Sequence, residues 1–405
     1  MQYKVLKTPL QTRNINQDFV LASLNSDGEA LPDLFAEHKE ILDWDWIFAF
    51  SQRHKISGIF VNSLEKFGIV DRLPREIQNQ IDLIKRRAQQ RAARAGFTLQ
   101  QLHEALNKNN ISFLVLKGSV FIHDLYEEPA VRPYYDIDLL VPPHLVDKTE
   151  GILVSLGYKF YCPLIRTFDC IPLGRTPKSM GEKCFTSQVT RKLFKRFHNH
   201  FPYVLPREDR RLPVDLHWQL FRPGVLKTEP ASVWNHTREI KFDNLTFTTL
   251  SPEASLLYLA TKIAADGPED FSLGRVCDFC GYLKFFEGKT DLQTLEKTAG
   301  EWDAKNYLSL SLRLAKKLLD PGTIQIFHQN ITHNACFNFC FFISTRESLL
   351  MPPRRKGVLG FLTINVCSLF WDLGIFRMPR RAVKASVRSV IRFCQKRFLP
   401  KDGAD

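Results

Sequence analysis

The stretch "PYYDIDLLV", residues 133–141, combines a strand-like apolar run with two carboxylates, Asp136 and Asp138. Successive side chains of a strand alternate between its faces, so the two aspartates should point to the same side. Two ionised carboxylates this close repel each other unless a cation lies between them, and the hard divalent ions Mg²⁺ and Mn²⁺ prefer oxygen ligands. The stretch therefore predicts either a solvated strand end or a metal site.

The strand before this stretch ends in a turn that suits a phosphate. "ISFLVLKGS" (111–119) is short, apolar and rich in β-branched residues, and Gly118-Ser119 closes it. Such a turn lets backbone N–H groups and a hydroxyl approach an anion, although by itself it is equally typical of a turn without a ligand. Next to a strand with a carboxylate pair, the turn completes the two halves of a site for a metal and a nucleoside triphosphate.

A third carboxylate lies in "LPVDLHWQLF" (212–221), where Asp215 and His217 share one strand face. A charged side chain in so apolar a strand is costly unless it is paired, and a shared metal is one such partner. The other interpretation is an edge strand with one wet face. His217 is a candidate to contact the acceptor or the nucleotide, and it equally suits a structural histidine beside Trp218.

Two further patterns give weaker evidence for a functional site. His198 and His200 in "FHNHF" have no third ligand at zinc spacing, and the lone "CDFC" pair (277–280) is typical of core packing.

The remaining patterns predict an α+β protein. Helical periodicity runs through residues 17–106, "PHLVDKTEGILVSLGY" is helical up to Gly157, residues 238–250 form a hairpin pattern, and helical periodicity returns at Ser251. We expect a mixed β-sheet core between two helical regions. The predicted parts are an N-terminal helical region (1–106), a core (107–250) with an insertion at about 160–212, and a C-terminal helical region with a basic tail (251–405).

Composition indicates a globular protein in a reducing compartment. The 405 residues are 44% hydrophobic and 12% aromatic, which excludes a disordered chain. Nine cysteines are scattered without the spacing of a disulfide framework, and the first residues hold no apolar signal segment. We therefore expect a cytoplasmic protein.

The charge is concentrated at one end. Residues 354–405 hold twelve Lys and Arg against three acids, or +9 of the net +13. Within this tail, 357–376 is apolar enough to suggest a membrane span, but its polar stripe of Asn365, Ser368 and Asp372 favours a core or interface-lying helix. Residues 377–401 alternate basic and apolar side chains, which fits either a peripheral helix on an anionic membrane or a terminal helix docked on the body.

These residues together resemble a known family. The succession "LVLKGSVFIHDLYEEPAVRPYYDIDLLV", followed by "VDLHWQL", resembles the bacterial uncharacterised nucleotidyltransferase family of the DNA polymerase beta-like superfamily. That family has an apolar strand ending in Lys-Gly, then Arg-Pro, Asp-Ile-Asp-Leu-Leu-Val, and later an acidic residue before Leu-His-Trp. The resemblance covers roughly residues 40–290 and implies the nucleotidyltransferase fold.

The resemblance also implies roles for individual residues. The sixteen residues between Ser119 and Asp136 are more than the general superfamily motif has, although this family commonly has the longer gap. The implied ligands of the metal ions, which are also the catalytic residues, are Asp136, Asp138 and Asp215, and the implied nucleotide-binding residues are Lys117, Gly118, Ser119 and Arg132.

The predicted activity is metal-dependent transfer of a nucleoside monophosphate from a nucleoside triphosphate, such as ATP, to an acceptor, with release of pyrophosphate. The acceptor is open among sugar, peptide, protein and RNA. "KRRAQQRAARA" (85–95) keeps a nucleic-acid acceptor open, although it also suits a solvated helix face. The alternatives are a glycosyltransferase that uses a nucleotide-sugar and a non-catalytic nucleotide-binding or membrane-tethered module. We expect the protein in the cytoplasm, with peripheral contact at the inner face of the membrane as a further option.

Overall fold

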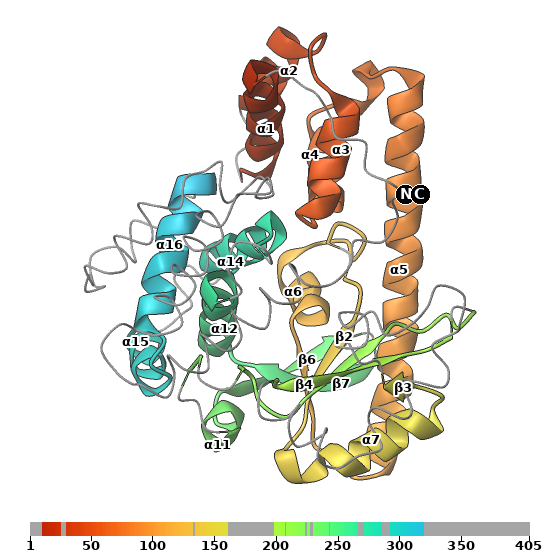
Figure 1. Ribbon diagram of the computed structural model, residues 1–405, viewed down its shortest axis with the longest axis vertical. Helices are drawn as coiled ribbons and strands as arrows, with labels where there is room; N and C mark the ends of the chain where they lie inside the picture. Colours follow the sequence, from red (N-terminus) through yellow and green to blue (C-terminus); the bar gives the residue numbers. More distant parts are fainter. Residues whose placement is uncertain are drawn as a thin grey trace, which may run out of the picture.

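Helices surround a five-stranded mixed sheet in the protein (Figure 1). The α+β class predicted from the sequence is therefore confirmed. The structure is a computed structural model, and it describes residues 10–319 except 26–29, 133, 161–197, 207, 223–224, 227–229, 243, 266–270 and 286–291.

The N-terminal part is helical, as its periodicity predicts. Its longest helix, α5, spans 34 residues, which corresponds to about 51 Å at 1.5 Å per residue. It ends close to the limit of the predicted helical region at residue 106: Asn109 caps it, and Asn110 adopts a left-handed backbone with φ of 54°. The helices are α1 (Leu10–Leu24), α2 (Ala30–His38), α3 (Trp44–Arg53), α4 (Ser57–Lys66), the 3-10 turn η1 (Val70–Arg72) and α5 (Arg75–Lys108).

The central sheet has the strand order β1-β2-β5-β4-β3. Strand β2 pairs parallel with β5 and antiparallel with β1, and the other pairs are antiparallel. Apolar side chains of β2 and β5 are fully buried, which explains the continuous apolar runs in their sequences. The strands are β1 (Leu114–Leu116), β2 (Ile137–Leu140), β3 (Lys159–Phe160), β4 (His200–Val204) and β5 (Val214–His217).

A strand, a helix, a second strand and a second helix follow one another between β1 and Gly157, and the helix predicted up to Gly157 is confirmed. Helix α6 (Gly118–Leu125) follows β1 almost directly, so the strand is shorter than the apolar run suggests. After β2, the 3-10 turn η2 (Pro143–Leu145) leads into α7 (Val146–Ser155), and Gly157 has the positive φ of 90° that favours glycine.

Strand β4 corrects the sequence interpretation of residues 160–212. The sequence assigns this segment to an insertion beside the core, yet β4 lies inside the central sheet between β3 and β5. Its alternating burial places Phe201 and Tyr203 in the core. At least this part of the segment belongs to the core, while 161–197 lie outside the described residues.

A hairpin and a second group of helices complete the described part. Strands β6 (Thr237–Phe242) and β7 (Leu245–Leu250) pair antiparallel around the predicted turn, with Phe242 opposite Leu245. Ser251 then begins the predicted helix, because its Oγ accepts the backbone N–H of Ala254. The helices are α11 (Pro230–Trp234), α12 (Pro252–Ala265), α14 (Leu273–Phe285), α15 (Leu292–Glu301) and α16 (Lys305–Leu319).

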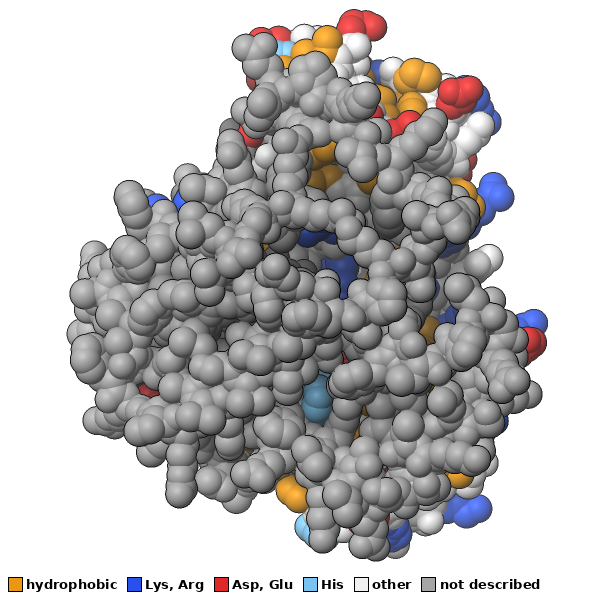
Figure 2. Space-filling model, in the orientation of Figure 1, with side chains coloured by type: hydrophobic (Ala, Val, Ile, Leu, Met, Phe, Trp, Pro, Cys, Tyr) orange, Lys and Arg blue, Asp and Glu red, His pale blue; other side chains and the backbone are white. Residues whose placement is uncertain are grey.

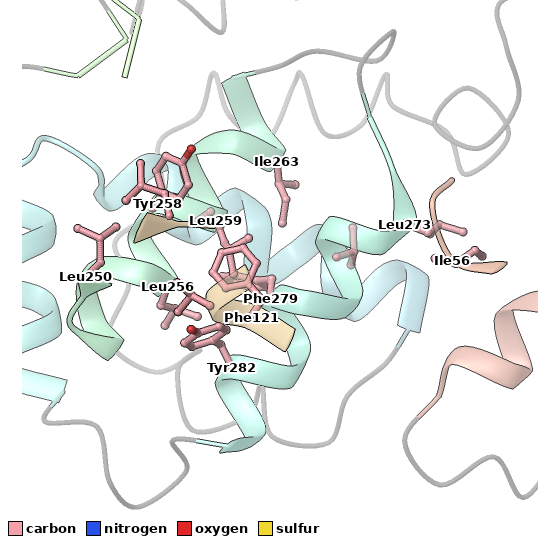
Figure 3. Close-up of a cluster of buried hydrophobic side chains, with 14 of the residues drawn as sticks. Ile56, Phe121, Leu250, Leu256, Tyr258, Leu259, Ile263, Leu273, Phe279 and Tyr282 are labelled. Carbon is pink, nitrogen blue, oxygen red and sulfur yellow. The ribbon is translucent and has the colours of Figure 1, made fainter. Parts of the chain in front are cut away.

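Apolar packing holds α6 against α12 and α14 (Figure 3). Phe121 on α6 meets Tyr282 on α14 edge-to-face, with ring centroids 5.3 Å apart. Phe279 and Leu259 are buried in the same cluster. Burying one such side chain contributes about 1.5–3 kcal/mol, so this cluster fixes the position of α6 and of the turn before it.

Membrane contact falls outside what the structure describes. Among the helices within residues 10–319, none is both long and apolar enough to cross a membrane. The apolar segment 357–376 and the basic segment 377–401 lie outside the described residues.

Candidate functional site

The strand register brings two predicted carboxylates side by side. Asp138 on β2 lies directly opposite Asp215 on the parallel neighbour β5. Paired residues of neighbouring strands project to the same face of a sheet, so the two carboxylates share one small volume. Asp136 is exposed and precedes β2 by one residue.

Asp138 is the centre of the polar contacts. Its Oδ1 accepts a hydrogen bond from Lys117 Nζ at 2.5 Å and another from His217 Nε2 at 2.9 Å, while only 2% of the residue is exposed. Burial alone would raise the pKa of this carboxyl, but the Lys117 ammonium and the His217 imidazole together hold it well below its usual range. Asp138 is therefore ionised at neutral pH.

The pKa values of Asp215 and Asp136 are raised, in contrast to that of Asp138. Burial, followed by the nearby charges of Asp138 and Asp136, raises the pKa of Asp215 to about 8. Although part of Asp136 remains open to solvent, the protein atoms around its carboxyl, followed by the charge of Asp138, also raise the pKa of Asp136. At Asp136 and Asp215, burial and mutual repulsion thus outweigh the positive charge of the nearby lysines, which is an electrostatic condition that favours binding a cation.

Asn199 links the two histidines of the site. Its Nδ2 donates to Nδ1 of His217 at 3.3 Å, which leaves the His217 proton on Nε2 for Asp138. Its Oδ1 accepts from Nδ1 of His200 at 3.3 Å, and Nε2 of His200 lies 3.6 Å from Oδ2 of Asp215. Burial lowers the pKa of His217 to about 4 and lowers that of His200 as well, so both rings are neutral.

The donor set fits a divalent metal ion. One ligand atom each from Asp138, Asp215 and His217 lies within 4.8 Å of the others. The sequence predicts Asp136 rather than His217 as the third ligand, and the structure therefore adds an imidazole to the three predicted carboxylates. Two carboxylates and an imidazole are donors that Mn²⁺ and Mg²⁺ accept when carboxylates dominate the set.

The turn before α6 has an unusual backbone. Lys117 has φ of 53° and ψ of −123°, a strained combination for a residue with a side chain. The next residue, Gly118, has no room for a side chain, because a Cβ there would lie 2.6 Å from Cβ of Tyr134. This turn directs Lys117 to Asp138 and begins α6 beside the carboxylates.

Ser119 is buried in the first turn of α6 with only 2% exposed, and its Oγ has no hydrogen-bond partner among the described residues. A buried hydroxyl without a partner is costly, and the start of a helix offers unpaired N–H groups as well. The two features together suit an anion.

Arg132 lies in a different setting from the other predicted residues. Its guanidinium makes two hydrogen bonds to Asp278 on α14, from Nε at 3.1 Å and from Nη2 at 2.9 Å. Tyr126 donates a third bond to the same carboxylate at 2.9 Å. The structure thus gives Arg132 a fixed protein partner, and its contact with a nucleotide stays a prediction.

Sequence reasoning did not assign several basic and polar side chains to this site. His200, considered from the sequence only as a zinc ligand, begins β4 inside the presumed insertion, and Asn199 directly precedes it; the pairing of β4 with β5 brings His200 to Asp215 and Asn199 to His217. Lys55, in the turn after α3, interacts with Asp136, and Lys262 on α12 interacts with Asp215. Histidine and basic side chains are visible near the middle of the face shown in Figure 2.

Comparison with known proteins identifies the relatives of the chain. The pattern of a family described as "Uncharacterised nucleotidyltransferase" matches residues 40–320. No curated protein matches the chain. A crystal structure of an antigenic nucleotidyltransferase-like protein from Paracoccidioides brasiliensis is similar at 16% identity, covering 56% of this chain and 93% of that chain with a TM-score of 0.30.

Proposed function

Because the chain belongs to the uncharacterised nucleotidyltransferase family, we propose that it transfers a nucleoside monophosphate from a nucleoside triphosphate to an acceptor hydroxyl and releases pyrophosphate. Membership of a nucleotidyltransferase family implies a transferase with a nucleoside triphosphate as substrate. The observation that carries the finer proposal is the pairing of Asp138 with Asp215 beside a helix start where the Ser119 hydroxyl has no hydrogen-bond partner in the described part of the chain. One half of this site suits a cation and the other half suits a phosphate.

In this proposal the carboxylates of Asp136, Asp138 and Asp215 would hold Mg²⁺ or Mn²⁺, and His217 would be a further donor once its Nε2 has lost the proton that it donates to Asp138. The bound ions would neutralise the phosphates, lower the pKa of the acceptor oxygen and stabilise the developing charge during in-line displacement.

The chain itself would orient the triphosphate. Ser119 Oγ and the free N–H groups of α6 donate to phosphate oxygens, and Gly118 lets the backbone approach closely. Lys117 lies beside the same turn, so its ammonium can reach a phosphate once it leaves Asp138.

Asp215 is the proposed acceptor of the proton. Without a metal its pKa is raised to about 8; a bound ion would favour the charged carboxylate, which is the form that can take up a proton during the reaction. His200 Nε2, 3.6 Å away, is neutral and lies where it can orient that carboxyl.

The test uses nucleoside triphosphates labelled at the α or the γ phosphorus, with Mg²⁺ and cell extract. We expect transfer of the α label only, because pyrophosphate carries the γ phosphate away. Asp138→Asn should lower the transfer rate by at least about 10³-fold, since it removes a charge that balances the metal.

Asp71→Asn is the matched control, because Asp71 is exposed on η1 and makes no contact with the site. It should keep full activity. Transfer of the γ label, or full activity in Asp138→Asn, would refute nucleotidyl transfer at this site. A glycosyltransferase would transfer neither label from a nucleoside triphosphate.

A further inference from the structure

The charged side chains in the middle of helix α5 are all positive. Residues 83–103 hold five basic side chains and no acid. Lys85 is paired with Glu65 on α4, so its charge is compensated. The uncompensated positive charge therefore lies on the arginines that follow.

Three of these arginines form one stripe. Arg87, Arg91 and Arg94 are spaced by four and three residues, which places them on the same side of a helix. Arg87 and Arg94 are exposed and Arg91 is half-buried, while Ala88 and Ala95 face the core. Within the described part of the chain, none of the three arginines forms an ion pair, so the stripe is open to an anionic partner.

An exposed aromatic ring joins this stripe to the carboxylates. The guanidinium of Arg91 lies over the ring of Tyr135, 3.9 Å from its centroid. Tyr135 is 44% exposed and directly precedes Asp136. Consecutive Cα atoms are about 3.8 Å apart, so the backbone that carries this ring lies next to that of the proposed metal ligand Asp136.

We propose that the arginine stripe and Tyr135 bind a single-stranded nucleic acid whose 3′ end is the acceptor. The stripe supplies cations for the backbone phosphates, and the Tyr135 ring, held by Arg91, supplies a surface on which a base stacks. This inference rests on the proposed function, because it names the acceptor of the same site. The 3′ oxygen would bond to the α phosphorus, the bond from that phosphorus to pyrophosphate would break, and the proton would pass to Asp215.

The length of the stripe favours a strand over the nucleoside triphosphate itself. From Arg87 to Arg94 the helix rises about 10 Å, which is several times the spacing of about 3.4 Å between charges along one strand of a duplex. The triphosphate already has donors at the start of α6, through Ser119 and the backbone N–H groups. A polyanion therefore accounts for the stripe better than a mononucleotide does.

The test is fluorescence anisotropy with a labelled single-stranded oligonucleotide of 12 or so uridines, about the length that one protein groove covers. We expect binding that weakens with salt, with a slope of log K against log[salt] of about −2 if three phosphates are neutralised. Arg87→Gln/Arg91→Gln/Arg94→Gln should remove most of this slope. Tyr135→Ala should weaken binding about tenfold, and Tyr135→Phe should preserve it because the ring remains.

Arg86→Gln is the matched control on the same helix. Arg86 is exposed and points about 100° away from Arg87, so its loss should leave the affinity within twofold. Circular dichroism of every variant confirms that the helix is intact. A DNA oligonucleotide of equivalent sequence shows whether the 2′-hydroxyl contributes.

The outcomes separate this inference from the proposed function. If the protein binds Mg²⁺ and nucleoside triphosphate in calorimetry but no oligonucleotide, or if the triple variant binds the oligonucleotide as well as the wild type, the acceptor proposal is wrong and the proposed function stands. If vesicles of anionic lipid bind through the stripe while oligonucleotides do not, the acceptor proposal is also wrong.

If the oligonucleotide binds and the triphosphate does not, the proposed function fails. Transfer of the α label to a 3′-hydroxyl but not to a 3′-phosphate would support both.

Discussion

Lys117 illustrates how one residue connects both halves of the site. Its strained backbone begins α6, where the phosphate donors lie, and its ammonium contacts Asp138 among the carboxylates. Burial alone would lower the pKa of Lys117, but Asp138 raises it well above the usual value, so the side chain is always charged. The lysine thus occupies a contact on Asp138 that a metal ion would also use.

This competition leads to a prediction for Lys117→Met. Without the ammonium, Asp138 is left with His217 alone, so Mg²⁺ should bind about tenfold tighter or more in the absence of nucleotide, because like charges near the ion are removed. The affinity for nucleoside triphosphate should fall, since a phosphate partner is lost. Titration calorimetry measures both.

Lys241→Met on the exposed edge of β6 provides the control and should change neither affinity. An unchanged Mg²⁺ affinity in Lys117→Met would show that the lysine and the metal do not compete.

At the scale of elements, α14 fixes the segment that leads into β2. Asp278 on this helix receives two hydrogen bonds from Arg132 and one from Tyr126. Only 3% of the Asp278 side chain and 12% of the Arg132 side chain are exposed. A two-bond pair at such burial holds the loop between α6 and β2 against α14, and so helps to orient Tyr135 and Asp136.

Asp278→Asn should therefore destabilise the protein. The substitution leaves the buried Arg132 charge without its carboxylate, and breaking a buried pair costs about 3–5 kcal/mol. Urea denaturation should show a lower midpoint with an unchanged slope.

Asp209→Asn offers a comparison within the same chain, because the pair of Asp209 with Arg211 is more exposed, at 23% and 14% of the side chains. Exposed pairs contribute about 1 kcal/mol or less. If the two substitutions cost the same, the Arg132 pair is not an anchor of the loop.

At the scale of the whole molecule, folding brings residues from distant segments of the chain together at the candidate site. Lys117 follows β1, Asp138 lies on β2, His200 on β4 and Asp215 on β5, while α14 packs against α6 and α12 against α14. Folding therefore concentrates acidic groups from distant parts of the chain. The stability of the metal-free protein should depend on how these groups are charged.

The raised pKa of Asp215 determines the sign of this dependence. A carboxyl whose pKa is about 8 when folded and 3.8 when unfolded stabilises the fold while it is protonated, and this contribution is lost as the pH rises through 8. In the presence of a chelator, this group alone should lower the free energy of unfolding by about 1.4 kcal/mol between pH 7 and pH 9. The lowered pKa values of His217 and His200 change the free energy of unfolding mainly below pH 7, outside the range compared.

Asp215→Asn isolates the effect, because the amide does not titrate. The decrease in unfolding free energy between pH 7 and pH 9 should be smaller in the variant than in the wild type by about the same 1.4 kcal/mol. Equal decreases in both proteins would show that Asp215 is ionised at pH 7 without a metal. Saturating Mg²⁺ should remove the difference as well, since the bound ion favours the charged carboxyl.

Local patterns predicted the elements well, because their periods arise within one segment. The helical periodicity up to residue 106, the turn at Gly118 and the hairpin before Ser251 follow from neighbouring residues alone. The carboxylates at Asp136, Asp138 and Asp215 were also recognisable, because a charge in an apolar strand needs a partner.

Only the tertiary structure decided what those residues contact. The sequence by itself determined the α+β class and the acidic residues, but not that β4 belongs to the sheet, that His200 lies beside Asp215, or that Arg132 has Asp278 as its partner. Pairing of distant strands and helices depends on packing across the whole core, and no periodicity within one segment encodes it. For the same reason the stacking of Arg91 on Tyr135, which links a basic helix to the aspartates, became visible only in the folded protein.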